Sequence, residues 1–270
     1  MKNWIVALAL IASSGIIAQQ KEGTILYEKK MNMYKAIQNE QMKAYIPEFR
    51  TSKHMLLFSD SISIYRLLPE EEAPDPFAGG GNGQVMIRMG GGADGGDMYK
   101  NFSQQKAIQS TEMGGKNFLI IDTLKPQPWK ITEETKKILG YTCYKATRKI
   151  TQPRMMMRTM SIGGTGPTDT VKNSSANTPK EIDVVAWYTI NIITPAGPEN
   201  YGQLPGLILQ LDIDNGTTVF NATEVKTTLN KKELKEPTKG KAVSRAEYQK
   251  LMMELMSNQM PGMMMQRNNN

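Results

Sequence analysis

The thioether side chains of methionine are the most numerous candidate ligands in this sequence. The chain contains 20 methionines, and many of them fall in two clusters. One cluster is Met155, Met156, Met157 and Met160, and the other lies between residues 252 and 265 and ends with Met263, Met264 and Met265. Thioethers are soft ligands that suit Cu(I) or Ag(I). Soft-metal sequestration is therefore one hypothesis, beside scavenging of oxidants and a simple adaptable apolar surface.

Other residue types that commonly catalyse reactions or bind metals are scarce. His54 is the single histidine and Cys143 the single cysteine. Nucleophilic catalysis needs a base beside the nucleophile, and a zinc site needs three or four suitable ligands. We therefore interpret His54 as a surface or core histidine and Cys143 as a small buried hydrophobic residue. The sequence predicts a protein that is not an enzyme and has no cofactor.

The carboxylates, the glycines and the distribution of charge also lack the patterns of known catalytic or binding motifs. The carboxylates show no spacing typical of a glycosidase pair or a calcium loop, and the glycine-rich segment 79–96 lacks the Gly-Lys-Ser/Thr ending of a phosphate loop. The formal net charge is +7, but the basic residues are spread along the chain without a stripe of interleaved aromatics. This distribution argues against nucleic-acid binding and is compatible with attraction to an acidic surface such as lipopolysaccharide or anionic lipid.

The N-terminal residues predict export. Lys2 precedes an apolar run over residues 4–12, and Ile16 and Ala18 occupy the positions that favour cleavage before Gln19. Residues 1–18 are thus expected to be a signal peptide. No later run approaches the roughly 18 apolar residues that a transmembrane helix requires. Because no cysteine lies at the cleavage point, we expect a periplasmic or extracellular protein without a lipid anchor.

Strand signals dominate the remainder of the chain. Alternating or β-rich segments bounded by turn residues occur at 23–34, 52–58, 61–68, 103–113, 116–122, 128–131, 140–150, 183–193, 204–213 and 217–228. They predict a mainly β (α+β) fold, with a single curved antiparallel sheet or half-barrel of about ten strands. Periodicity does not decide whether 132–139 is a short helix or part of a strand.

We predict one domain over residues 19–257. Two segments rich in Gly, Pro and polar residues, 69–97 and 151–181, are interpreted as exposed insertions between strands. Ser244 and Glu247 form a capping box before an apolar face that begins with Tyr248 and Leu251. This pattern predicts a C-terminal helix that packs on the sheet or docks a partner. Residues 258–270 are expected to be a disordered tail rich in Met and Asn.

Residues 204–228 carry the strongest hairpin signal. Leu204-Pro205-Gly206-Leu207 fits a type II turn, in which Gly206 would need a positive φ. Asn215-Gly216 predicts a two-residue turn that pairs Leu211 with Phe220 and Leu209 with Ala222. The preceding residues 194–203 are rich in turn formers and are a candidate pocket rim. Tyr201 and Gln203 are its candidate ligand-binding side chains.

Several elements in order carry a resemblance to a known family. They are Trp129-Lys130-Ile131, Gly140-Tyr141, Cys143, Ala186-Trp187-Tyr188-Thr189, Gly197-Pro198, Tyr201 and Leu204-Pro205-Gly206-Leu207-Ile208. This pattern resembles the GLPGLI family of secreted proteins from Bacteroidota-type bacteria, although Gln203 stands in place of the first glycine of that motif. The resemblance implies the compartment and the fold but no activity. The strand pattern is also similar to the half-barrel of periplasmic lipoprotein carriers, a likeness of fold alone.

Two functional hypotheses result from the sequence. The first is a non-catalytic envelope protein that binds an apolar ligand or an outer-membrane protein partner on its curved sheet. The alternative is sequestration of Cu(I) or Ag(I) by the methionine clusters. Neither hypothesis involves nucleic acid or a transmembrane segment, and the sequence leaves the oligomeric state open.

Overall fold

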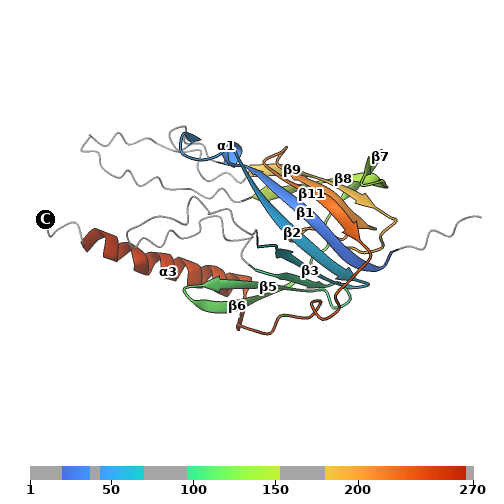
Figure 1. Cartoon of the computed structure of the whole chain (residues 1–270). Helices are drawn as coiled ribbons and strands as arrows, with labels where there is room; N and C mark the ends of the chain where they lie inside the picture. Colours follow the sequence, from blue (N-terminus) through green and yellow to red (C-terminus); the bar gives the residue numbers. More distant parts are fainter. Residues whose placement is uncertain (1–19, 37–42, 70–95, 153–179, 266–270) are drawn as a thin grey trace, which may run out of the picture.

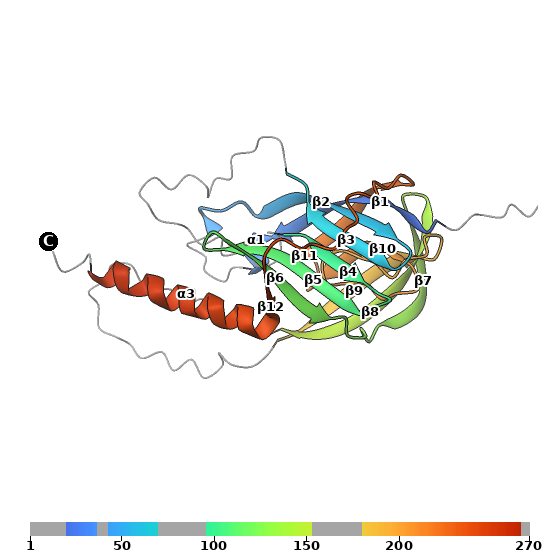
Figure 2. The same ribbon diagram turned by 90° about the horizontal axis from the view of Figure 1, so that it is seen from below.

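The computed structural model describes residues 20–36, 43–69, 96–152 and 180–265, which form one curved sheet with a long C-terminal helix (Figures 1 and 2). The strands of the sheet are β1 (Glu22–Asn32), β2 (Phe49–Ser59), β3 (Ile62–Leu67), β4 (Met98–Asn101), β5 (Lys106–Met113), β6 (Lys116–Thr123), β7 (Lys130–Ile138), β8 (Tyr141–Gln152), β9 (Lys180–Thr189), β10 (Leu207–Ile213), β11 (Thr218–Lys226) and β12 (Lys241–Ser244). Their spatial order is β12-β6-β5-β4-β3-β2-β1-β11-β10-β9-β8-β7. The helices are α1 (Met33–Ala36) and α3 (Arg245–Met265).

The mainly β fold with a curved antiparallel sheet is confirmed, since every strand pair except β12–β6 is antiparallel. The strands β4 and β12 are additional to those expected from the sequence, and each is only four residues long. The open question over 132–139 is resolved as a strand, because 128–131 and 132–139 contribute to the single strand β7.

The predicted hairpin of β10 and β11 has the expected register, with Leu211 opposite Phe220. The predicted type II turn before it is wrong. Gly206 is not among the glycines with positive φ, which is found instead at Gly202 and Gln203. The requirement for glycine has another cause: a Cβ on Gly206 would lie 2.0 Å from the backbone oxygen of Thr189. A close backbone approach therefore excludes a side chain at this position.

Residues 190–206 fill the centre of the inner face of the sheet, the face that carries Tyr27 and Phe220 in the main hydrophobic core. Ile192, Ala196 and Leu204 from this segment are buried in the same core. Ile208, expected on the polar side of its strand, is also fully buried. A β-bulge between Ile208 and Gln210 in the pairing with β9 explains this difference, since it places Ile208 opposite Tyr188 on the inner face, where Gly197 packs on its side chain.

Two further segments cover other parts of the sheet. The helix α3 begins with the predicted capping box, in which Ser244 and Glu247 exchange hydrogen bonds, and packs Tyr248 and Leu251 against Phe118 of β6. Residues 227–240 cross the outer face of β3 to β6, where Leu234 contacts a second apolar cluster. In both views α3 runs past the end of the sheet (Figures 1 and 2), and its helical backbone continues to Met265. The disordered tail predicted from residue 258 therefore starts too early.

The two longest connections between strands leave the sheet at the same end. The segment 70–95 joins β3 to β4 and the segment 153–179 joins β8 to β9, and both pairs are antiparallel neighbours. These connections start at the sheet end where β1 finishes and β2 begins. Most of the predicted insertions 69–97 and 151–181 and the predicted signal peptide 1–18 lie outside the described residues, but the ends of the second insertion, 151–152 and 180–181, belong to β8 and β9. Within the described part of the chain, no helix has the length and apolar character needed to span a membrane.

Candidate functional site

Residues 197–203 are held against the inner face by two buried lysines. Lys100 of β4 is 2% exposed, and its Nζ donates hydrogen bonds to the backbone oxygens of Gly197 (3.2 Å) and Tyr201 (2.7 Å). Burial lowers the pKa of Lys100 to about 7, opposed by the nearby negative charge of Glu199. Lys29 of β1 forms a 2.8 Å ion pair with Glu199. We call this clamped region, residues 194–206 with Lys29 and Lys100, the inner corner.

The two predicted ligand-binding side chains lie in the inner corner. The amide of Gln203 donates to the backbone oxygen of Lys125 (3.0 Å) and accepts from the backbone N–H of Gln127 (3.2 Å). Tyr201 is half-buried, and burial raises its pKa to about 12. Gln203 thus links the corner to the residues before β7. A ligand contact for Tyr201 or Gln203 stays a prediction.

Arg148 of β8 is the polar residue of this region that the sequence interpretation missed. Its guanidinium lies near two aromatic rings, with its Cζ 5.1 Å from the ring centroid of Trp129 and 5.2 Å from that of Tyr201. Burial lowers the pKa of Arg148, and the neighbouring Tyr201 opposes this effect. A signal was present in the sequence: Arg148 alternates with Ala146 and Ile150, so it occupies a position of the apolar inner face.

A small cavity lies between the inner corner and the neighbouring strands. Its volume is about 80 Å³, and it is lined by Tyr65, Gly96, Met98, Gln109, Glu199, Asn200 and Arg245. Pockets for drug-sized ligands usually enclose roughly 300–1,000 Å³. The cavity is thus too small for a lipid. A larger and more open hollow of about 430 Å³ lies on the outer face, where Lys145 stands beside the carboxylates of Asp183 and Asp212.

The single histidine and the single cysteine are both buried, and four strands separate β2 from β8 in the sheet. His54 stacks on Tyr65 with ring centroids 5.0 Å apart, and its Nε2 lies 2.9 Å from the Ser52 hydroxyl. Burial raises the pKa of the Cys143 thiol to about 11. His54 and Cys143 therefore do not form a nucleophile and base pair.

No group of three or more His, Cys, Asp or Glu side chains within the described ranges is arranged to hold a metal ion. The first methionine cluster, Met155, Met156, Met157 and Met160, lies outside those ranges. Met263, Met264 and Met265 form the last residues of α3, of which only the helical backbone is described. Soft-metal binding by these methionines stays a prediction.

The end of β1, α1 and the start of β2 form an exposed arm, defined here as residues 28–36 and 43–53. In Figure 1 the arm lies around α1, at the upper end of β1 and β2. β2 extends past β3 at this end, because pairing between them begins only at His54 and Leu67. The arm exposes three aromatic side chains: Tyr34 by 36%, Tyr45 by 87% and Phe49 by 42%.

Basic side chains surround these aromatics. Lys30 Nζ lies 4.0 Å from the Phe49 ring centroid, and Lys43 Nζ lies 5.9 Å from that of Tyr34. Apart from the buried Lys29, the arm carries five basic residues and two acidic ones; these are Lys30, Lys35, Lys43, Arg50 and Lys53, and Glu28 and Glu48. The arm is therefore aromatic and positively charged.

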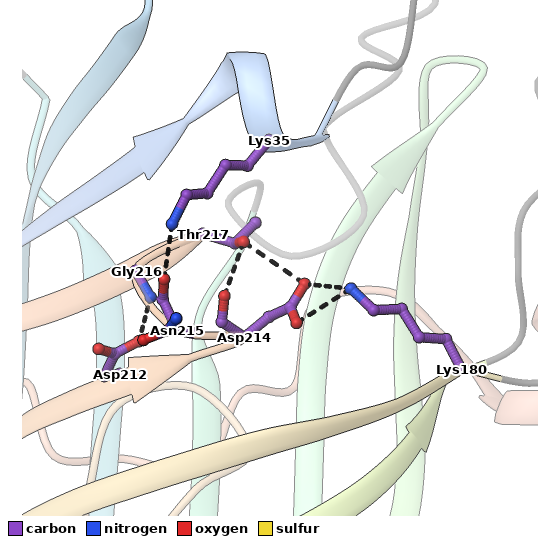
Figure 3. Close-up of polar contacts among 7 residues, drawn as sticks. All are labelled: Lys35, Lys180, Asp212, Asp214, Asn215, Gly216 and Thr217. Carbon is purple, nitrogen blue, oxygen red and sulfur yellow. Dashed lines mark hydrogen bonds and ion pairs between the residues drawn. The ribbon is translucent and has the colours of Figure 1, made fainter.

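The base of the arm is fixed to the β10–β11 turn, as Figure 3 shows. Lys35 Nζ donates to the backbone oxygen of Asn215 (2.7 Å). The turn is itself braced, since Asp212 Oδ1 accepts from the Gly216 N–H (2.6 Å) and Asp214 binds Lys180 (2.7 Å). These contacts hold α1 in place and so preorganise the exposed surface of the arm.

The central part of the chain matches a known family. Residues 129–210 match the Porph_ging family, described as a protein of unknown function. This is the GLPGLI family. The resemblance inferred from sequence is thus confirmed over the segment from Trp129 into β10, which is less than a third of the chain. We call residues 129–210 the GLPGLI segment. It contains Arg148 and most of the inner corner, whereas the arm precedes it.

A likeness to one solved structure confirms the fold class. The crystal structure of PNGF-II in space group C2 is 18% identical with a TM-score of 0.50, over 86% of this chain and 33% of that chain. A second PNGF-II structure, in space group P21, is 17% identical with a TM-score of 0.49 and the same coverage. This chain thus spans about a third of the length of PNGF-II. LprF from Mycobacterium bovis is 9% identical over 82% of this chain and 92% of its own, with a TM-score of 0.27, at which the likeness is not informative. No curated protein matches the sequence.

Proposed function

We propose that this GLPGLI protein is a non-catalytic component of the bacterial cell envelope that binds the anionic lipid surface of the outer membrane through its arm. The observation that carries the proposal is the group of three exposed aromatic residues, Tyr34, Tyr45 and Phe49, within a surplus of positive charge. Aromatic rings settle at the boundary between water and lipid, and each Lys or Arg near an anionic surface contributes about 1 kcal/mol.

Lys30, Arg50 and Lys53 carry the electrostatic part of the proposal. They are exposed, and none has a carboxylate partner among the residues that the structure describes. Their charge is thus available to an outside anion. The net charge of +7 acts in the same direction by attracting the whole molecule to an acidic surface.

The compartment and the filled inner face also favour this role. A signal peptide over residues 1–18 and a family of secreted proteins would place the chain where it meets outer-membrane lipids. An apolar ligand inside the curved sheet is the less favoured alternative, because the inner corner occupies the centre of that face and the cavity beside it measures only about 80 Å³. The distance in the sheet between His54 and Cys143 favours a role without catalysis.

Vesicle binding with matched charge variants tests the proposal. The arm variant Lys30→Gln, Arg50→Gln, Lys53→Gln is compared with a control variant of equal charge, Lys125→Gln, Lys130→Gln, Lys137→Gln, whose positions are also exposed. Each mature protein is sedimented with vesicles of phosphatidylcholine alone or mixed with an equal amount of phosphatidylglycerol.

We expect the wild type and the control to bind the mixed vesicles. The arm variant should bind at least about tenfold more weakly, since three contributions of about 1 kcal/mol are removed. If the arm and control variants lost vesicle affinity equally, net charge alone would explain the binding, and the proposal would be contradicted. Equal binding of the wild type to both vesicle types, or to neither, would contradict it as well.

A further inference from the structure

Arg148 has a different environment from three other cations of the described structure that interact with carboxylates. Lys29, Arg66 and Arg245 each form an ion pair with a carboxylate at 2.8 to 3.2 Å. Arg148 has no such partner within the described residues, and its Nε is buried there without a hydrogen-bond acceptor. Arg148 as a whole is only partly buried, but a donor that has lost water without gaining an acceptor carries a cost in free energy. An anion at this position would supply the missing interaction.

The neighbours of Arg148 offer its guanidinium cation–π contacts but no hydrogen-bond acceptor for Nε. The rings of Trp129 and Tyr201, at 5.1 and 5.2 Å, contribute cation–π attraction. The guanidinium N–H groups point outward in the plane of the group, where an aromatic face offers them no acceptor. The two rings therefore attract the cation but accept no hydrogen bond from its N–H groups.

The two aromatic walls are themselves fixed by the inner corner. The indole N–H of Trp129 donates to the backbone oxygen of Gly202 (2.9 Å). The backbone oxygen of Tyr201 accepts from Lys100 (2.7 Å), and Gln203 joins the same segment to residues 125–127. A site whose walls are held in this way loses little freedom when it binds a ligand.

We propose that Arg148, Trp129 and Tyr201 form a binding site for an oxyanion group, a carboxylate or a phosphate, of a small ligand. The planar fork of a guanidinium matches the two oxygens of such a group, whereas a lysine ammonium acts as a point charge. The site lies within the GLPGLI segment and on the inner face. It is independent of the arm, so either proposal can fail without the other.

NMR titration with simple anions tests the site. The indole N–H signal of Trp129 serves as reporter, because this residue contacts Arg148 and is hydrogen-bonded to Gly202. The protein is titrated with inorganic phosphate and with acetate, at an ionic strength kept constant with chloride. The variants are Arg148→Gln, Arg148→Lys and the control Arg66→Gln, which removes an ion-paired arginine of β3.

We expect a saturable shift of the Trp129 signal with phosphate, acetate or both, in the wild type and in Arg66→Gln. The apparent affinity should fall at least tenfold in Arg148→Lys, which keeps the charge and loses the fork, and the shift should vanish in Arg148→Gln. If Arg148→Gln does not fold, the anion affinity of Arg148→Lys alone tests the proposal. A shift that does not saturate, or an affinity unchanged in Arg148→Lys, would overturn the proposal.

Discussion

The adjacent residues Lys29 and Lys30 separate two regions of this molecule that use the same residue type differently. Lys29 is buried in the inner corner and ion-paired to Glu199, while Lys30 is exposed on the arm and lies over the Phe49 ring. Successive residues of a strand face opposite sides of the sheet, so one step along β1 separates the two environments. The comparison shows that Lys29 is used within the protein itself, whereas Lys30, like Arg50 and Lys53 of the arm, has no carboxylate partner among the described residues.

The largest expected effect follows from breaking the inner corner at Gly206. In Gly206→Ala the new Cβ would meet the backbone oxygen of Thr189 at 2.0 Å, so the backbone must move. We expect a loss of at least about 3 kcal/mol in the free energy of unfolding, measured by urea denaturation.

Gly140→Ala is the matched control for this substitution. Gly140 has a φ of 82° but open space around its Cβ position, so only the backbone conformation is strained. The expected loss is about 1–2 kcal/mol. An equal or smaller loss for Gly206→Ala would show that the close approach to Thr189 is not a constraint.

A second prediction concerns the pH dependence caused by Lys100. Burial holds its pKa at about 7, below the ordinary value of 10.5, so between these values the unfolded chain binds more protons than the folded one. Stability should therefore rise with pH in this window, by about 1.5 kcal/mol between about pH 7 and about pH 8.5. Lys100→Met should lack this rise. Urea denaturation of the wild type and of Lys100→Met at each pH gives the difference between their free energies of unfolding. Cys143 and other titratable groups that both proteins share cancel in this difference. Equal pH slopes in the two proteins would contradict the inferred burial of the amine.

A smaller effect is expected from the arm aromatics. The double variant Tyr45→Ser, Phe49→Ser should weaken binding to anionic vesicles by about tenfold or less, and this loss should persist at high salt, because apolar contacts are not screened. The control Ile131→Ser, Leu139→Ser alters two exposed apolar residues near the β7 edge. Both double variants should change the free energy of unfolding by less than about 1 kcal/mol. If the control variant lost vesicle binding, or the arm variant bound as well as the wild type, Tyr45 and Phe49 would not contribute to membrane binding.

Local signals made a large part of the fold predictable. The two-residue turn at Asn215-Gly216 set the β10–β11 register, and Ser244 with Glu247 marked the start of α3, because these interactions join residues close in sequence. β4 and β12 escaped prediction, since four residues carry too little alternation; all of β4 is buried, and only Val243 of β12 is. Pro205-Gly206 gave a turn signal, yet the requirement for glycine comes from Thr189 on another strand.

The candidate sites were less accessible to prediction. The alternation of β8 placed Arg148 on the inner face, but its two aromatic partners come from distant parts of the chain, 19 residues before it for Trp129 and 53 after it for Tyr201. The exposure of Tyr45 on the arm depends on how far β2 extends past β3, a property of the whole sheet. Gln203 was recognised as unusual, while its bonds to residues 125 and 127 emerged only in three dimensions.

The most direct test of the central claim is to place an environment-sensitive fluorophore on the arm. Pro47→Cys lies on the exposed arm and Thr135→Cys on β7, and native Cys143 is buried with a raised pKa, so that labelling is selective for the new thiol. With vesicles that contain phosphatidylglycerol, we expect a blue shift of the label at residue 47 and none at residue 135. A shift at residue 135 alone, equal shifts at both positions, or no shift at residue 47 would contradict membrane binding through the arm.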